Sequence, residues 1–159
     1  MTDDQVIATI TASAPRRVIG VSALTFLGAL LIYMAFAAPP ALIWQLFLIA
    51  MGAGALWLAS FMWQATAASL ELTETELRDT SGMVLARIAD VESVSRGAFA
   101  MKPSNGFTLK TNRPQARCWR PGLWWRTGRM VAIGGVTSGA ATKPVADMIA
   151  AMVAERQAD

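Results

Sequence analysis

The chain has 159 residues, of which 54% are hydrophobic, and a formal net charge of +3. It contains no histidine and one cysteine, which excludes the usual transition-metal sites, every histidine-based nucleophile or proton shuttle, and an intrachain disulfide. Only Arg16 and Arg17 among the 14 Lys and Arg, and only Asp3 and Asp4 among the 11 Asp and Glu, precede Leu70, so the charge is concentrated after that residue. We expect no cofactor.

The first segment, residues 1–15, has an amphipathic pattern. Val6, Ile7 and Ile10 fall on one face of a helix. Asp3-Asp4 stand near its start, where acidic side chains complement the helix dipole, and Pro15 follows. We therefore expect a short helix over Thr2–Ala14 that lies on the membrane surface or against the folded domain.

A long uncharged stretch follows. No charged residue occurs from Val18 to Leu70, and Pro39-Pro40 divides the stretch into Val18–Ala38, of 21 residues, and Ala41–Trp63, of 23 residues. A helix needs roughly 20 apolar residues to cross the hydrocarbon core of a bilayer. The pattern predicts a transmembrane hairpin of two helices within residues 16–66.

The flanks of the hairpin predict its orientation. Arg16-Arg17 precede the first span, the loop is uncharged, and basic residues dominate after the second span. The positive-inside rule then places both termini in the cytoplasm. In a rival interpretation, Pro15–Ala37 is a signal peptide cleaved after Ala35-Phe36-Ala37. Its apolar stretch is longer than the usual 7–15 residues, and a second span follows at once, which favours the hairpin.

The spans carry few polar side chains and no ionisable group other than Tyr33. Transporters and proton pathways place charged or titratable residues at mid-membrane, so conduction is not expected. Small residues permit close helix contact. They serve either the packing of the two helices on each other or docking against another membrane protein. The candidate helix-packing residues are Gly20, Gly28, Gly52 and Gly54.

From Leu70 the apolar residues alternate, which predicts strands and tight turns over residues 67–159. The expected strands are Leu70–Thr73, Glu76–Asp79, Met83–Ile88, a segment from Ile88 that ends near Phe99–Met101, Phe107–Thr111, Gln115–Trp119 and Met130–Val136. The expected turns are Thr80–Gly82, Ser104–Gly106 and Asn112–Pro114. A closing helix is expected over Lys143–Arg156, with Val145, Met148, Ile149, Met152 and Val153 on one side.

The run Leu70–Val94 contains two strands separated by a glycine turn and then the pattern Ile88-x-x-Val91. Following two membrane spans, it resembles small bacterial two-span membrane proteins with a cytoplasmic PH-like domain. The resemblance covers the hairpin and about the last 90 residues. It implies a small α+β domain, mainly antiparallel β, with a curved sheet capped by a C-terminal helix, and a binding or scaffolding role without enzymatic activity. Gly122–Gly139 departs from the pattern by being richer in Gly, Trp and Arg.

The strongest functional signal is the stretch Arg96–Arg129, which holds basic residues, including Lys102 and Lys110, and no Asp or Glu. Within it, Trp119–Arg129 interleaves three tryptophans with arginines. Basic residues near an anionic leaflet are attracted to it, and tryptophan prefers the membrane interface. Membrane lipids are therefore the favoured partner, a protein partner or a solvated face with core tryptophans stay open, and nucleic acid is disfavoured. The candidate lipid- or partner-binding residues are Arg113, Arg117, Trp119, Arg120, Trp124, Trp125, Arg126 and Arg129.

Other motifs carry no chemistry. The glycines of Gly134–Gly139 lack the spacing of a phosphate-binding loop, and Cys118 has no histidine to act as its base. Two functions follow as hypotheses. The chain is a membrane-anchored, non-enzymatic binding or scaffold protein, or it is an accessory subunit of a larger inner-membrane complex, respiratory or photosynthetic, docked through its small-residue helix faces.

Overall fold

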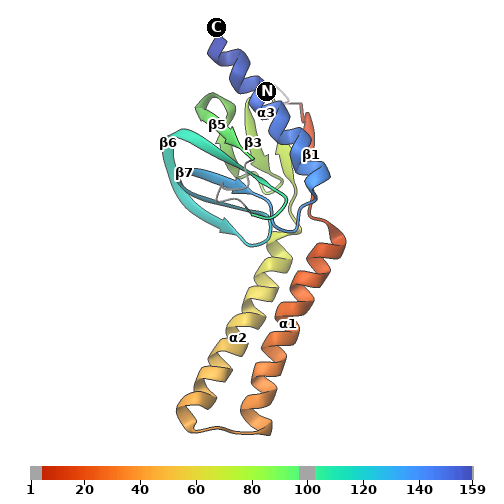
Figure 1. Ribbon diagram of the computed structural model, residues 1–159, viewed down its shortest axis with the longest axis vertical. Coiled ribbons are helices and arrows are strands. Elements are labelled where there is room, and N and C mark those ends of the chain that lie inside the picture. Colours follow the sequence, from red (N-terminus) through yellow and green to blue (C-terminus); the bar gives the residue numbers. More distant parts are fainter. Residues whose placement is uncertain (1–4, 97–102, 159) are drawn as a thin grey trace. The chain divides into compact units, whose positions relative to one another are not determined.

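The computed structural model describes residues 5–96 and 103–158. It divides into two compact units: a helical hairpin, Ala14–Gln64, and a folded unit that combines Met1–Ser13 with Ala65–Asp159. The folded unit is therefore discontinuous in sequence, because the hairpin is inserted between its first strand and its second (Figure 1).

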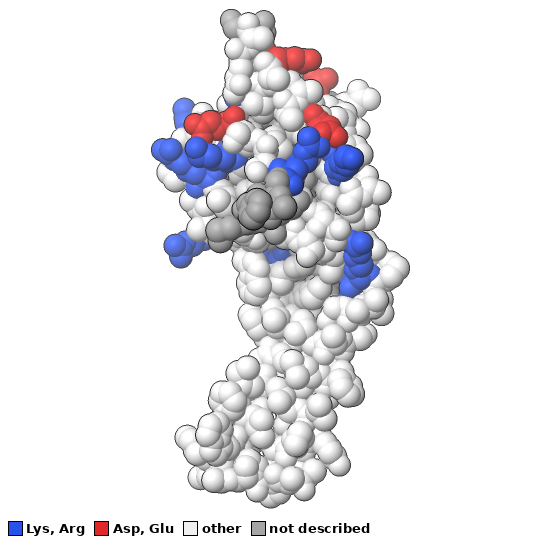
Figure 2. Space-filling view, viewed as in Figure 1, with Lys and Arg blue, Asp and Glu red and all other residues white. Residues whose placement is uncertain are grey.

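The hairpin consists of α1, Ala14–Ala37, and α2, Leu42–Ala65. Both helices are long and apolar enough to cross a membrane, with mean hydropathy of 2.2 and 1.9. Most of their apolar side chains face outward; Phe26 and Ile43, for example, are 70% and 72% exposed. The predicted pair of spans is confirmed as two exposed apolar helices joined by a short loop at Pro39-Pro40, and Figure 2 shows no charged side chain along most of their length.

The expected helix over Thr2–Ala14 is wrong. Ala8–Ile10 form strand β1, which pairs antiparallel with β2, Leu70–Leu72, in the register Ile10 to Leu70. Ile10 is 1% exposed and belongs to the hydrophobic core. The apolar residues of this segment therefore complete a sheet whose next strand, β2, begins at Leu70, on the far side of the hairpin in the sequence.

The first sheet has four strands in the order β1-β2-β3-β4, all antiparallel. Strand β3, Glu76–Asp79, and strand β4, Val84–Arg87, are joined by the predicted turn around Gly82. The buried Asp79 stabilises this turn, because its Oδ1 accepts hydrogen bonds from the Ser81 N–H at 2.8 Å and from the Met83 N–H at 3.2 Å. The expected meander from Leu70 to Arg87 is confirmed.

A 3-10 turn, Ile88–Asp90, leads into a second sheet of order β5-β6-β7. Strand β5 is Val91–Ser95, and the expected end of this strand near Phe99–Met101 lies outside the described residues. The predicted turn at Ser104–Gly106 is confirmed, with Asn105 at a φ of 57°. It opens strand β6, Phe107–Arg120, which pairs with β7, Trp124–Ile133.

Strand β6 corrects the sequence prediction, because it runs through Asn112–Pro114, where a turn was expected. Pro114 is accommodated because β5 pairs with β6 only as far as Thr111, and because the register between β6 and β7 shifts between Lys110 and Gln115. A proline lacks the N–H that a ladder requires, so strands tolerate it at edges and bulges. The hairpin β6–β7 therefore extends beyond β5 as two strands.

Strand β7 also differs from the expected Met130–Val136, since it begins at Trp124 and doubles back on itself. The Gly134 N–H, just after its end, donates to the Leu123 carbonyl, just before its start, at 2.9 Å. Ten residues of straight strand would span roughly 33 Å. Gly128, at a φ of 57°, adopts the left-handed conformation at the bend, which favours glycine. The bend brings the part of β7 near the β6–β7 turn against β4.

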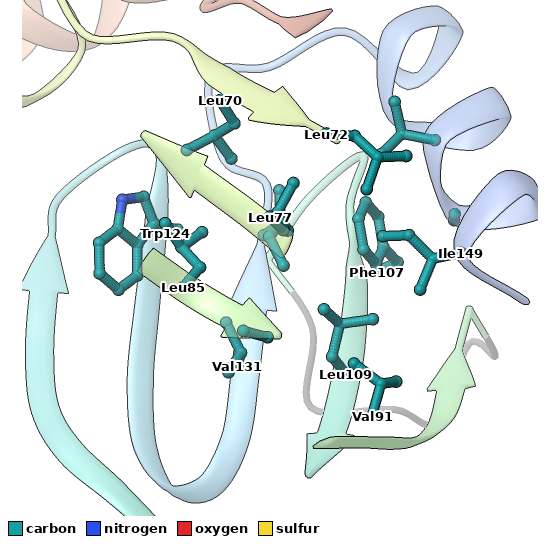
Figure 3. Close-up of a cluster of buried hydrophobic side chains, with 14 of the residues drawn as sticks. Leu70, Leu72, Leu77, Leu85, Val91, Phe107, Leu109, Trp124, Val131 and Ile149 are labelled. Atoms are coloured by element: carbon teal, nitrogen blue, oxygen red, sulfur yellow. The ribbon is translucent and has the colours of Figure 1, made fainter. Parts of the chain in front are cut away.

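The closing helix α3 covers Gly139–Ala158 and buries Val145, Ile149 and Val153, as its apolar spacing predicts. Figure 3 shows Ile149 directed toward Phe107 and Leu72 of the sheets, with Trp124 and Leu85 further along the same core. Arg156 fixes the far end of α3, because its guanidinium donates to the Ile88, Ala89 and Val91 carbonyls at 2.6, 2.7 and 2.6 Å. One core thus joins both sheets and the helix.

Candidate functional site

The β6–β7 hairpin carries all eight candidate lipid- or partner-binding residues. No acidic residue occurs between Glu92 and Asp147, so the hairpin contributes positive charge only. Lys110 on β6 forms an ion pair with Glu92 at 3.0 Å, and Lys102 lies outside the described residues. The arginines further along β6 and β7 make up the remaining positive charge of this hairpin.

The strand register separates the candidate residues into two faces. Trp119 lies opposite Trp125, whereas Arg120 lies opposite Trp124 and Cys118 opposite Arg126. Directly paired residues point to the same side of a ladder, and successive residues point to opposite sides. The face that carries Trp124 is turned toward the core, so the Trp119–Trp125 pair lies on the outer face.

Trp124 is a core residue and is not on the exposed face where we expected it. It is 1% exposed and packs with the buried residues of both sheets (Figure 3). Its Nε1 atom is buried without a hydrogen-bond partner among the described residues. The side chain therefore stabilises the fold through its apolar area and is inaccessible to a ligand.

Arg126 is likewise engaged within the protein. Its Nη1 donates to the Val84 carbonyl at 2.8 Å, to the Leu85 carbonyl at 3.3 Å and to Gln115 Oε1 at 2.9 Å, and its Nε donates to the Ala116 carbonyl at 2.8 Å. The guanidinium thus connects β6 and β7 to the edge of β4. It joins the two sheets, a role that the sequence did not reveal.

The outer face of the hairpin is open to solvent. Trp119 is 52% exposed, Trp125 is half-buried, and Arg117 is exposed. Together with Thr127 these side chains line a shallow hollow of about 380 Å³. A second hollow of about 420 Å³ is lined by the two tryptophans, by the half-buried Arg120 and by residues of the β6–β7 turn. We call the outer-face residues Arg117, Trp119 and Trp125, together with Arg120 at the end of β6, the tip face. Arg120 leaves the ladder on the side of Trp124, but it lines the second hollow with Trp119 and Trp125.

Arg113 and Arg129 are exposed but belong to a different part of the hairpin. Arg113 lies on β6 next to Pro114, and Arg129 follows Gly128, where β7 bends. The Thr111 hydroxyl donates to the carbonyls of both residues, at 2.9 and 3.2 Å. The structure therefore brings these two arginines together at the bend, away from the β6–β7 turn.

The β6–β7 turn lies beside the point where the chain leaves the folded unit for α1. Ser13, the last residue before α1, donates its N–H to the Val136 carbonyl at 2.8 Å. Val136 in turn donates its N–H to the carbonyl of Gly122, in the turn, at 2.9 Å. Two hydrogen bonds thus connect the turn to the chain segment that enters the first span. The tip face belongs to the end of the folded unit that is tethered to the hairpin.

Three of the four candidate helix-packing glycines lie between α1 and α2. A Cβ atom at Gly28 would come within 2.8 Å of the Gly52 carbonyl oxygen, and one at Gly52 within 2.9 Å of the Gly28 carbonyl oxygen. At Gly20 it would meet the Met62 side chain at 2.9 Å. Gly54 differs, since among the described residues no atom outside its own stretch of α2 lies within 4 Å of the corresponding position.

Other parts of the folded unit are weaker candidates for a functional site. A hollow of about 460 Å³ near the start of α3 is lined by Arg96 and Lys143, but Arg96 forms an ion pair with Asp147. The Cys118 Sγ lies 3.5 Å from Met83 Sδ and is half-buried. No group of His, Cys, Asp and Glu suited to a metal ion occurs among the residues that the structure describes.

Comparison of the chain with protein-family models, with curated proteins and with solved structures finds no match.

Proposed function

We propose that the chain is a non-enzymatic, membrane-anchored binding or scaffold protein of the bacterial inner membrane. In this proposal a cytoplasmic PH-like domain contacts anionic lipid headgroups through the tip face. The four-strand and three-strand antiparallel sheets and the closing helix α3 support the PH-like assignment. The two exposed apolar helices support the anchor.

The insertion of the hairpin between β1 and β2 supports the orientation. Because Ile10 pairs with Leu70, residues before the first span and after the second must lie on the same side of the membrane for the domain to fold. It also disfavours the signal-peptide interpretation, since cleavage after Ala37 would remove β1 and with it the core residue Ile10.

The observation that carries the proposal is the place of the tip face. Its arginines and exposed Trp119 adjoin the turn that is hydrogen-bonded, through Val136, to Ser13 at the start of the first span. A basic residue beside an anionic leaflet gains roughly 1 kcal/mol. Arg117 and Arg120 have no acidic neighbour in sequence to offset this attraction.

Hydrogen exchange of the full chain in lipid nanodiscs tests the proposal. We compare nanodiscs of phosphatidylcholine with nanodiscs that also contain phosphatidylglycerol. The amides of residues 117–125 should exchange more slowly with the anionic lipid, and added salt should weaken this protection because it screens exposed charges. Equal exchange in both lipids would refute headgroup binding. Strand β3, in the core, is the internal control.

The alternative function, an accessory subunit of a larger inner-membrane complex, is favoured by Gly54. Its open surface on α2 leaves room for a foreign helix, whereas Gly28 and Gly52 are used between the protein's own helices. Co-purification from mild detergent followed by mass spectrometry tests it. A partner that is retained by the wild-type chain and lost from Gly54→Leu would support this function over the first.

A further inference from the structure

We infer that Trp119 and Trp125 insert into the interfacial zone of the bilayer as an aromatic anchor, with Arg117 and Arg120 on the phosphates of anionic phospholipids beside them. This inference rests on the proposed function and adds to it a depth and an orientation. Insertion of the two tryptophans would attach the folded unit to the membrane at a third point, in addition to its two covalent connections to the spans.

Trp119 and Trp125 form a pair on the outer face of the hairpin. Trp119 and Trp125 are directly opposite in the register of β6 and β7, so both rings leave the same face of the ladder. Trp119 exposes 52% of its surface, whereas the neighbouring Trp124, on the other face, exposes 1%. The core therefore uses one tryptophan of the adjacent pair Trp124-Trp125 and leaves the second on the surface with Trp119.

The chemistry of tryptophan and arginine suits the boundary between hydrocarbon and headgroups. Tryptophan combines a large apolar ring with one N–H donor and is enriched where hydrocarbon meets headgroups. Arg117 lines one hollow with the two tryptophans, and Arg120 lines the second hollow with them. Rings that enter the interface beside these arginines would place the guanidinium groups at the level of the phosphates, where arginine can bind in a bidentate manner.

The tip face adjoins the chain segment that leads into the first span. The β6–β7 turn is connected to Ser13 through the hydrogen bonds of Val136, and Ser13 immediately precedes α1. By contrast, α3 starts at Gly139, near this same end, and Ala154 lies fifteen residues along it, roughly 22 Å away at 1.5 Å per residue. The two positions offer a matched pair for measuring depth.

The experiment uses a nitroxide label in the full chain, reconstituted into vesicles of phosphatidylcholine and phosphatidylglycerol. Cys118→Ser removes the natural thiol, and Thr127→Cys places the label in the hollow beside the tryptophan pair while keeping both rings and both arginines. Ala154→Cys, on an exposed position of α3, is the control site. Collisions of the label with oxygen, which concentrates in lipid, and with a water-soluble nickel complex report its depth.

The label at position 127 should collide more with oxygen than with nickel, and the label at 154 should show the reverse. Trp119→Ala should shift the label at 127 toward the nickel complex, while exchange of the β3 amides stays unchanged and shows that the domain remains folded. Water-like accessibility at 127 in the unsubstituted tip face would overturn the inference, whatever the variant does.

The two proposals fail in different ways. If the anionic lipid protects the amides of residues 117–125 but the label at 127 stays in water, the contact is electrostatic only; the proposed function then stands and insertion falls. If the protection is also absent, both fall.

Discussion

Arg17, in the first turn of α1, binds the last turn of α2 at Trp63. Its Nη2 donates to the Trp63 carbonyl at 2.8 Å, and its guanidinium carbon lies 3.9 Å from the centre of the Trp63 ring. At the loop end the roles of the helices are reversed, since Gln45 of α2 donates to the Ala35 carbonyl of α1 at 2.9 Å. In each case a side chain of one helix donates to a backbone carbonyl near the end of the other helix.

We expect Arg17→Lys to weaken the hairpin by about 1–2 kcal/mol, because lysine keeps the charge but loses the planar group that both donates to the carbonyl and stacks on the ring. Thermal unfolding of the full chain in detergent measures the effect. Arg113→Lys, on an exposed position, is the matched control. Equal melting temperatures for the two variants would show that the Arg17–Trp63 contact contributes nothing.

Substitutions at Gly28 and Gly54 should have opposite signs. Gly28→Ala would force a Cβ to within 2.8 Å of the Gly52 carbonyl oxygen, so the helices must separate and the hairpin loses roughly 1–3 kcal/mol. Gly54→Ala meets nothing and should stabilise α2 by up to about 1 kcal/mol, the difference in helix propensity. Melting temperatures of the two variants in detergent measure both effects. A loss of stability in Gly54→Ala would contradict the prediction and would show that Gly54 also packs against another part of the protein.

Arg126→Gln should destabilise the folded unit by about 2–4 kcal/mol, because it leaves the buried Leu85 and its neighbour Val84 without the donor that now binds their carbonyls. The exposed Arg129→Gln removes the same charge and should cost little. Hydrogen exchange of the β4 amides compares the two. If Arg126→Gln changes only lipid contact and leaves this exchange unchanged, the side chain is a ligand-binding group after all.

Trp124→Ala should unfold or strongly destabilise the folded unit, with a loss of about 3–5 kcal/mol, whereas Trp119→Ala should leave its stability nearly unchanged. Trp124→Phe should cost less than the alanine variant, since it keeps most of the ring and removes a buried N–H that has no acceptor among the described residues. Chemical denaturation of the three variants checks the order. A large loss at Trp119 would contradict its outer position.

A topology reporter that is active only outside the cytoplasm should be silent when fused before Met1 or after Asp159 and active when inserted at Pro39-Pro40. The pairing of Ile10 with Leu70 requires the two termini to give the same result, and the basic residues that flank the spans predict that this result is silence. Opposite results at the two termini would mean that β1 and β2 cannot pair in the membrane-inserted chain.

The hairpin could be predicted from the length of its two uncharged apolar stretches, and the strands from Leu70 to Arg87 from the alternation of their apolar residues. β1 could not, because Val6, Ile7 and Ile10 suit one face of a helix and a strand of three residues shows too little alternation to compete. Its strand conformation is imposed by pairing with Leu70–Leu72, a contact across the whole hairpin that no local pattern encodes.

The candidate site was predicted as a region but not as a set of roles. Because β7 begins at Trp124, the successive residues Trp124 and Trp125 point to opposite sides of the strand. Only one of the two side chains can therefore lie on the exposed face, and the other points into the core. The sequence prediction missed the start of β7 at Trp124, because Pro121 and Gly122 directly before it indicate a turn and not the beginning of a long strand. The role of Arg126 depends on the bend at Gly128, which folds β7 back toward β4.

The insertion of the hairpin between β1 and β2 also sets an order of events during biosynthesis. β1 leaves the ribosome first but has no partner until both spans have been made and placed in the bilayer and residues 70–72 have followed. A chain that inserts only one span puts β1 and β2 on opposite sides of the membrane and can never bury Ile10. Correct insertion is therefore a precondition of folding, and a misinserted chain exposes an incomplete core to the proteases that remove unfolded proteins.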